Sequence, residues 1–169
     1  MRDTATASST AAWVAAWRGL AAFLPPPLCN VACDDVSWRL AGYSRLRRFC
    51  SAFPRLMRFV LSFRLLGFMP AAMALRAQLI DAAVVDFVKA GGRQILIMGA
   101  GFDARAVRLA PTLPPDVRVV EVDAPASAAQ KRAGVARLSP ALPRLAAWTF
   151  VTHDFEREPL PSLAAKLER

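Results

Sequence analysis

The sequence predicts an α/β protein in which N-terminal helices precede a doubly wound parallel sheet. It contains three short apolar runs, at residues 95–98, 117–122 and 148–152. Continuous rather than alternating hydrophobicity is typical of parallel strands that are covered on both faces. The stretches between the runs, 103–109 and 127–138, are long enough to form the helices that connect parallel strands. The order βαβαβ is the first half of a doubly wound sheet, so the predicted sheet is incomplete.

The composition fits one ordinary domain with a substantial core. The chain has 169 residues, of which 55% are hydrophobic and 21% are charged, and its mean hydropathy is +0.31. These values exclude an intrinsically disordered chain. The formal charge of +9 lies mostly in the first 93 residues, which hold 12 basic and 5 acidic residues against 10 and 8 in the remainder. Such a balance permits an anionic partner but does not require one.

The N-terminal part is expected to be helical. Prolines 25–27, Gly42, Pro54 and Gly67 separate short segments in which arginines alternate with Leu, Phe and Trp. A longer helix is predicted at 71–90, where Gly91 and Gly92 follow as a C-terminal signal.

Helical projection of 71–90 assigns its two faces. Gln78, Asp81 and Lys89 share one face, which we expect to be exposed to solvent. The opposite, core-facing stripe is expected to contain Arg76, Ile80, Ala83 and Phe87. A cation therefore begins the apolar stripe.

The cysteines and apolar segments indicate a cytoplasmic protein without a resident metal. Cys29, Cys33 and Cys50 match no disulfide or zinc framework, and His153 is distant in sequence, so we expect reduced thiols. The apolar stretch at 11–24 lacks a cleavage pattern, although a transit peptide stays open as a minor alternative. The apolar window at 56–75 contains two arginines, so no transmembrane helix is expected.

A glycine loop and an acidic residue predict a nucleoside-binding site. Gly99, Ala100 and Gly101 follow the first predicted strand, and Asp123 ends the second, 24 residues after Gly99. Glycines at such a turn let the backbone approach a ligand, and the acid can accept hydrogen bonds from ribose hydroxyls. The alternative is that the glycines only form a tight turn and that Asp123 caps the next helix.

The charges near this loop favour a sulfonium nucleoside over a dinucleotide. Gly99, Gly101 and Ala104 also satisfy the dinucleotide fingerprint, but Asp103 would place a carboxylate beside the pyrophosphate. A zwitterionic ligand has an ammonium that tolerates Asp103 and a carboxylate that Arg76 can bind. The alternative for Arg76 is a side chain that only covers apolar surface.

The end of the third predicted strand offers a site for an adenine. Asp154 can accept a hydrogen bond from an exocyclic amine, and Phe155 can contact the ring face. The alternative is an exposed turn that leads into residues 156–158.

These residues and their surroundings resemble the leucine carboxyl methyltransferase family, including its bacterial branch of S-adenosylmethionine-dependent methyltransferases. The similarity runs from about Thr10 to Arg157. Its motifs are Arg76 with Ile80-Asp81, residues 91–94, Gly99-Ala100-Gly101-Phe102-Asp103 with Arg105, and Glu121-Val122-Asp123 with Pro125 and Lys131.

The resemblance implies a class I, Rossmann-like methyltransferase fold and S-adenosyl-L-methionine as cofactor. Residues 1–93 would form a helical lid or docking segment, and residues 94–169 the first βαβαβ half of the cofactor-binding domain. In the family, the residues matching Arg76, Gly99 to Gly101, Asp123 and Asp154-Phe155 hold the methionine carboxylate, the methionine part, the ribose and the adenine. The chain departs from the family at Ala77, where a threonine is usual, and in the absence of later strands, so we expect a truncated or fragmentary copy.

Methyl transfer to a carboxylate or phenolate needs alignment and desolvation rather than acid or base catalysis, so no catalytic residue is assigned. The acceptor is expected to be an oxygen nucleophile on a small molecule or a protein. Two alternatives stay open: an NAD-type Rossmann fragment, and a non-catalytic basic module that binds an anionic partner. Nucleic acid is not favoured as that partner, because the arginines can be solvated rims of amphipathic helices.

Overall fold

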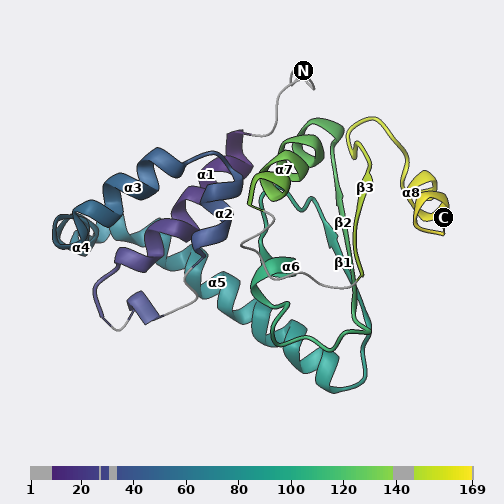
Figure 1. Ribbon diagram of the computed structural model, residues 1–169, viewed down its shortest axis with the longest axis horizontal. Coiled ribbons are helices and arrows are strands. Elements are labelled where there is room, and N and C mark those ends of the chain that lie inside the picture. The colour runs from purple at the N-terminus through teal and green to yellow at the C-terminus, as the bar shows by residue number, and fades with distance from the viewer. Residues whose placement is uncertain (1–8, 27, 31–33, 139–146, 169) are drawn as a thin grey trace.

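A computed structural model describes residues 9–26, 28–30, 34–138 and 147–168 of the chain. Short helices occupy one end of the molecule and a parallel sheet the other, and the long helix α5 (Arg64–Lys89) runs between the two ends (Figure 1). Cys33 and Pro27 lie outside the described residues.

Within the described ranges, α5 is preceded by four α-helices and two short 3-10 turns. They are α1 (Ser9–Leu20), η1 (Ala21–Phe23), η2 (Leu28–Asn30), α2 (Asp35–Leu40), α3 (Ser44–Ala52) and α4 (Pro54–Ser62). Asp34 caps α2, because its carboxylate accepts hydrogen bonds from the Ser37 amide at 2.9 Å and the Ser37 hydroxyl at 2.6 Å. Pro54 opens α4 at a position whose amide has no partner within the helix, so it acts as the predicted breaker.

The predicted break at Gly67 and the predicted start of the long helix at residue 71 are wrong. Helix α5 begins at Arg64 and continues through Gly67 and Pro70, both of which are buried. A Cβ at Gly67 would lie 2.2 Å from the Leu61 carbonyl oxygen, so glycine here lets α5 pack closely against the end of α4. Pro70 removes only one hydrogen bond near the start of a 26-residue helix.

The predicted faces of α5 are also partly wrong. Gln78 and Lys89 are exposed as expected, but the Asp81 side chain is only 13% exposed. All four residues expected in the core-facing stripe are exposed: Ile80 and Phe87 are 37% and 49% exposed, and Arg76 and Ala83 are exposed as well. The inner face of α5 instead contains small residues and a carboxylate that arginines from another helix neutralise, an arrangement that hydrophobicity alone does not reveal.

The three predicted strands are confirmed to within a residue. They are β1 (Gln94–Met98), β2 (Arg118–Asp123) and β3 (Ala147–Thr152), and they pair in parallel in the order β1-β2-β3. Ile97 pairs with Glu121, which pairs with Phe150. The connecting helices are α6 (Arg105–Arg108) and α7 (Pro125–Leu138), and α8 (Leu160–Leu167) follows β3. The chain is therefore an α/β protein with an open, Rossmann-like parallel sheet.

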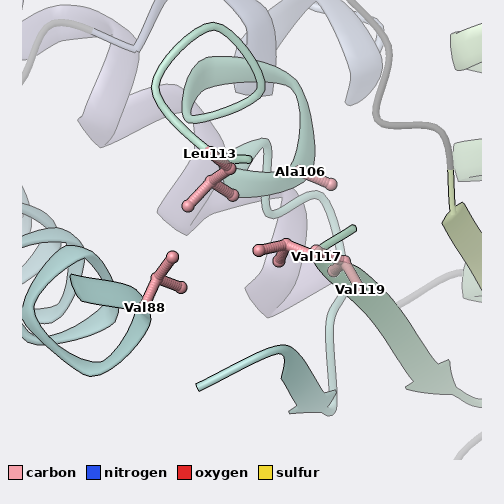
Figure 2. Close-up of a cluster of buried hydrophobic side chains, with 5 residues drawn as sticks. All are labelled: Val88, Ala106, Leu113, Val117 and Val119. Carbon is pink, nitrogen blue, oxygen red and sulfur yellow. The ribbon is translucent and has the colours of Figure 1, made fainter. Parts of the chain in front are cut away.

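The main core lies between the sheet, α5 and α6. Figure 2 shows this cluster, which contains Val88 of α5, Ala106 of α6, Leu113, Val117 and Val119, and all five are buried. Ile95, Ile97 and Trp148 from the same face of the sheet pack against this cluster. This packing fixes the orientation of β1 and therefore the position of the loop that follows it.

The opposite face of the sheet is only partly covered. Leu163 of α8 packs there against Val120, Val122 and Val151. Leu96 and Met98 of β1 are 44% and 56% exposed on that side. The expectation of cover on both faces is thus correct for β2 and wrong for β1, because α8 lies over β2 and β3 but not over β1.

In the ranges that the structure describes, no single helix combines the length and apolarity of a membrane span. Helices α4 and α5 meet those criteria only when taken together, and they are bent by 101° where they meet.

Candidate functional site

The loop after β1 has the backbone conformation that its glycines allow. Gly99 and Gly101 have φ angles of +65° and +48°, which side-chain-bearing residues rarely adopt. The Ala100 amide donates to the Val122 carbonyl oxygen at 3.1 Å, and the Asp103 amide donates to the Ala100 carbonyl oxygen at 2.8 Å. These bonds turn the chain sharply at the carboxyl end of the sheet, where ligands bind in open α/β folds.

Asp123 joins this loop to the end of β2. One carboxylate oxygen accepts a hydrogen bond from the Gly101 amide, and the other accepts from the Ala124 amide at 2.7 Å. Asp123 therefore stabilises the backbone of the loop and of the residue that follows β2. An ionised carboxylate has about four acceptor positions, so two amides leave capacity for ligand hydroxyls.

A cavity of about 410 Å³ lies beside the glycine loop, within the range of small-molecule sites. Five of the eight predicted binding residues line it: Arg76, Gly99, Ala100, Gly101 and Asp103. Helix α1 contributes Thr10, Ala11, Val14, Ala15 and Arg18 to the same wall. The first helix of the chain thus lies directly against the loop, and a Cβ at Gly101 would be 3.0 Å from the Ala11 Cβ.

Asp103 lines the cavity but is held by protein groups. Its side chain is 7% exposed and pairs with the guanidinium groups of Arg105 and, at 3.4 Å, Arg18. Its second oxygen accepts from the Arg105 amide at 2.8 Å. Burial alone would raise the pKa of Asp103, but the positive charges of Arg105 and Arg18 outweigh burial and hold that pKa below its ordinary value.

An extended ion-pair network continues from this carboxylate. Arg105 Nε lies 2.7 Å from Asp81 Oδ1, and Arg108 Nη1 lies 2.5 Å from Asp81 Oδ2. Arg108 Nε is also 3.3 Å from Asp34 Oδ2 at the start of α2. Burial would lower the pKa of Arg108, but hydrogen bonding to Asp81 and the nearby carboxylates raise it. The network therefore anchors the loop to α1, α2, α5 and α6.

Sequence analysis missed most of this network. The sequence predicts no role for Arg18, and it places Asp81 on the solvent face. Arg105 and Arg108 offered a usable signal for this network. They lie together on a short helix that packs on the sheet, and arginines buried there need carboxylate partners.

Arg76 differs from the other arginines at the cavity. Its side chain is exposed, and among the described residues no carboxylate lies within ion-pair distance of it. Arg18 and Arg105, by contrast, are both paired with Asp103. The guanidinium of Arg76 is therefore the cation at this cavity that is available for an anionic group of a ligand.

The end of β3 lies next to Asp123 but outside this cavity. The His153 amide donates to the Asp123 carbonyl oxygen at 2.9 Å, which carries Asp154 and Phe155 to the same edge of the sheet. Asp154 accepts from the Glu156 amide at 3.0 Å, as expected for the turn alternative. Phe155 is 41% exposed, and its ring contacts the buried His153 ring edge to face at 4.9 Å.

A buried ion pair lies two residues before Asp123 in β2. Lys131 Nζ of α7 lies 2.5 Å from Glu121 Oε2, and both side chains are at most 2% exposed. Burial raises the pKa of Glu121, although Lys131 opposes that shift. The pair fixes α7 against the strand that ends in Asp123.

One protein family matches this chain along nearly its whole length, and individual known proteins match less than half of it. The leucine carboxyl methyltransferase family matches residues 11–167. A protein of Mycobacterium ulcerans is 45% identical over 76 residues, which are 45% of this chain and 24% of that protein. A protein of Mycobacterium marinum is 43% identical over 76 residues, which are 45% of this chain and 24% of that protein. A protein of Mycobacterium avium is 41% identical over 71 residues, which are 42% of this chain and 22% of that protein. The names of all three assign them provisionally as S-adenosyl-L-methionine-dependent methyltransferases. With its parallel sheet, glycine loop and cavity, the chain belongs to the leucine carboxyl methyltransferase family.

Proposed function

We propose that this chain binds S-adenosyl-L-methionine in the cavity beside the glycine loop and serves methyl transfer to an oxygen nucleophile. The observation that carries the proposal is the guanidinium of Arg76, which pairs with no carboxylate of the described residues and lines the same cavity as Gly99 and Gly101. Family membership and the names of the mycobacterial relatives support the choice of cofactor.

The residues present fit such a cofactor. Arg76 would pair with the methionine carboxylate, and the loop of Gly99 to Gly101 would contact the methionine part without side chains in the way. Asp123 would accept hydrogen bonds from the ribose hydroxyls. Asp154 and Phe155 would lie by the adenine, next to Asp123 through the His153 amide. Asp103, whose carboxylate lines the cavity, would face the ammonium group.

When bound, the cofactor supplies a methyl group on a positively charged sulfonium. An anionic oxygen acceptor displaces that methyl group in line, so the protein contributes orientation and exclusion of water. Helix α1 lies over the cavity with Ala11, Val14 and Ala15, and would shield it from solvent. We assign residues 1–93 to this covering role and residues 94–169 to cofactor binding.

We also propose a cytoplasmic location with reduced thiols. The support is the cysteine spacing, which matches no disulfide framework, and Cys50, which is buried in α3. Burial raises the pKa of the Cys50 thiol, which keeps it protonated and unreactive.

Calorimetric titration tests the cofactor assignment. S-adenosylhomocysteine should bind and NAD should bind more weakly, because Asp103 and Asp123 offer no complement to a pyrophosphate. Tighter binding of NAD would overturn the proposal in favour of a dinucleotide site. Exposed Asp116, whose partner is Arg93, offers a matched control: Asp116→Asn should leave both affinities unchanged.

A further inference from the structure

Helices α3 and α4 each carry the same short sequence unit. The unit Arg-Leu-x-Arg-Phe-x-x-x-Phe begins at Arg45 and again at Arg55, ten residues later. In both copies the last phenylalanine, Phe53 or Phe63, directly follows the helix that carries the rest of the unit. Sequence and secondary structure therefore repeat together.

The two units present aromatic side chains to solvent. The rings of Phe49 and Phe53 pack against each other with centroids 5.2 Å apart, and those of Phe59 and Phe63 do the same at 5.2 Å. All four side chains are more than half exposed, between 51% and 64%. Each pair thus forms an apolar knob on the surface rather than a part of the core.

The same surface carries unbalanced positive charge. The segment 36–80 contains eight arginines and no aspartate or glutamate. Six of them are exposed, and one of the six, Arg76, lines the cavity. In the described part of the chain no carboxylate lies within ion-pair distance of any of the other five: Arg45, Arg48, Arg55, Arg58 and Arg64. We call these five arginines and the four phenylalanines the basic-aromatic patch.

The patch is separate from the candidate cofactor site. Helices α3 and α4 lie at the end of the molecule remote from the sheet, and none of the patch residues lines the cavity (Figure 1). Leu65 and Phe68, in the first turns of α5, are 89% and 64% exposed and extend the apolar surface.

We propose that the basic-aromatic patch docks the protein onto an anionic lipid surface. Unpaired arginines beside exposed Phe and Leu on short amphipathic helices are the combination that seats helices in the headgroup region of a membrane. The positive charge complements acidic headgroups, and the paired rings supply apolar area. Nucleic acid fits less well, because in the Phe59–Phe63 pair the rings meet edge to face at 85°, so one ring face is already covered.

Co-sedimentation of the full chain with vesicles tests this docking surface. Binding should be strong to phosphatidylcholine vesicles that contain about 30% phosphatidylglycerol, weak to phosphatidylcholine alone, and weakened by salt. The double variant R55Q/R58Q should bind the anionic vesicles about 25-fold more weakly, at about fivefold per arginine. F59A/F63A should lose at least about tenfold, whereas F59L/F63L, which keeps apolar area, should retain most binding.

Matched controls lie outside the patch on exposed positions. Arg137→Gln on α7 and Leu160→Ala on α8 should leave vesicle binding unchanged. All variants should melt as the wild type does and bind S-adenosylhomocysteine with unchanged affinity, because none touches the cavity. Equal binding to neutral and anionic vesicles, or indifference to both double variants, overturns the proposal. Tighter binding to a single-stranded oligonucleotide, lost in F59L/F63L, would reassign the patch to nucleic acid.

Discussion

Arg18 of α1 and Asp103 of the loop after β1 form an ion pair across 85 positions of the chain, with Nη1 and Oδ2 3.4 Å apart. Both side chains are nearly buried, and Arg105 pairs with the same carboxylate. The helix that covers the cavity is thus tied by charge to the loop that forms its floor.

Asp103→Asn should lower the free energy of unfolding by about 3 kcal/mol at pH 7, because it leaves buried guanidinium groups without their partner. Urea unfolding measures the loss. The control is Asp116→Asn, whose exposed pair with Arg93 should contribute less than about 1 kcal/mol. Similar losses of unfolding free energy for the two variants would show that the buried ion pairs of Asp103 stabilise the fold no more than the exposed pair does.

Protonation of the Asp103 carboxylate should contribute to the loss of folding stability at acid pH. The pKa of Asp103 in the folded state is below its ordinary value of about 3.9, so around that pH the unfolded chain binds more protons at this site. The stabilisation is complete above that ordinary value and is lost as the pH falls through the folded pKa. Thermal unfolding between about pH 2.5 and pH 7 should therefore show a shallower acid limb for Asp103→Asn than for the wild type. An equally steep loss of stability in the two proteins would contradict the lowered pKa of Asp103.

Replacing Asp123 should weaken cofactor binding. Asp123→Ala removes a charged acceptor for the ribose, which corresponds to about 1.5 to 3 kcal/mol, or roughly tenfold or more in affinity. Because Asp123 also accepts from the Gly101 and Ala124 amides, the melting temperature should fall as well. Calorimetry with S-adenosylhomocysteine at a temperature where the variant is folded separates the effects, and an unchanged affinity would place the ribose elsewhere.

Arg76 should discriminate between ligands with and without the methionine carboxylate. Arg76→Ala should weaken S-adenosylhomocysteine binding but leave adenosine binding nearly unchanged, and Arg76→Lys should restore only part of the loss because an ammonium lacks the guanidinium fork. Titrations with both ligands provide the comparison. Equal losses for the two ligands would mean that Arg76 acts through folding.

The glycine loop offers a comparison of two neighbouring positions. Gly99→Ala and Gly101→Ala both place a side chain at positive φ, at a cost of about 1 to 2 kcal/mol. Only at Gly101 does the new Cβ meet α1, 3.0 Å from the Ala11 Cβ, whereas no atom lies within 4 Å at Gly99. Gly101→Ala should therefore lower the melting temperature more. A lower melting temperature for Gly99→Ala than for Gly101→Ala would show that α1 moves to accommodate the Cβ at position 101.

The uncovered side of β1 should promote self-association. Leu96 and Met98 expose apolar surface on β1, and β1 pairs with another strand on only one side in the described sheet. Leu96→Lys and Met98→Lys should reduce the mass measured by light scattering at high protein concentration. Leu79→Lys on α5, at a site that is 73% exposed, is the control that should change little.

The strands could be predicted from the sequence because each forms a continuous apolar run, although β1 is covered on one face only. The inner face of α5 could not, because Asp81 is compensated by Arg105 and Arg108, 24 and 27 positions away. Local periodicity contains no such information. Five of the eight predicted site residues line one cavity, but Asp123, Asp154 and Phe155 do not. The contribution of Arg18 to that cavity depends on how α1 folds back onto the loop.

The ion-pair network that joins α1, α2, α5 and α6 contains three carboxylates and three guanidinium groups, so its formal charge is zero. A single replacement by a neutral residue leaves one unit of charge inside the protein, while a paired replacement restores neutrality. Relatives that lose one member should therefore have lost a second of opposite sign, and these positions should covary. Ancestral or consensus designs of this chain need to exchange the six residues as a set: Arg18, Asp34, Asp81, Asp103, Arg105 and Arg108.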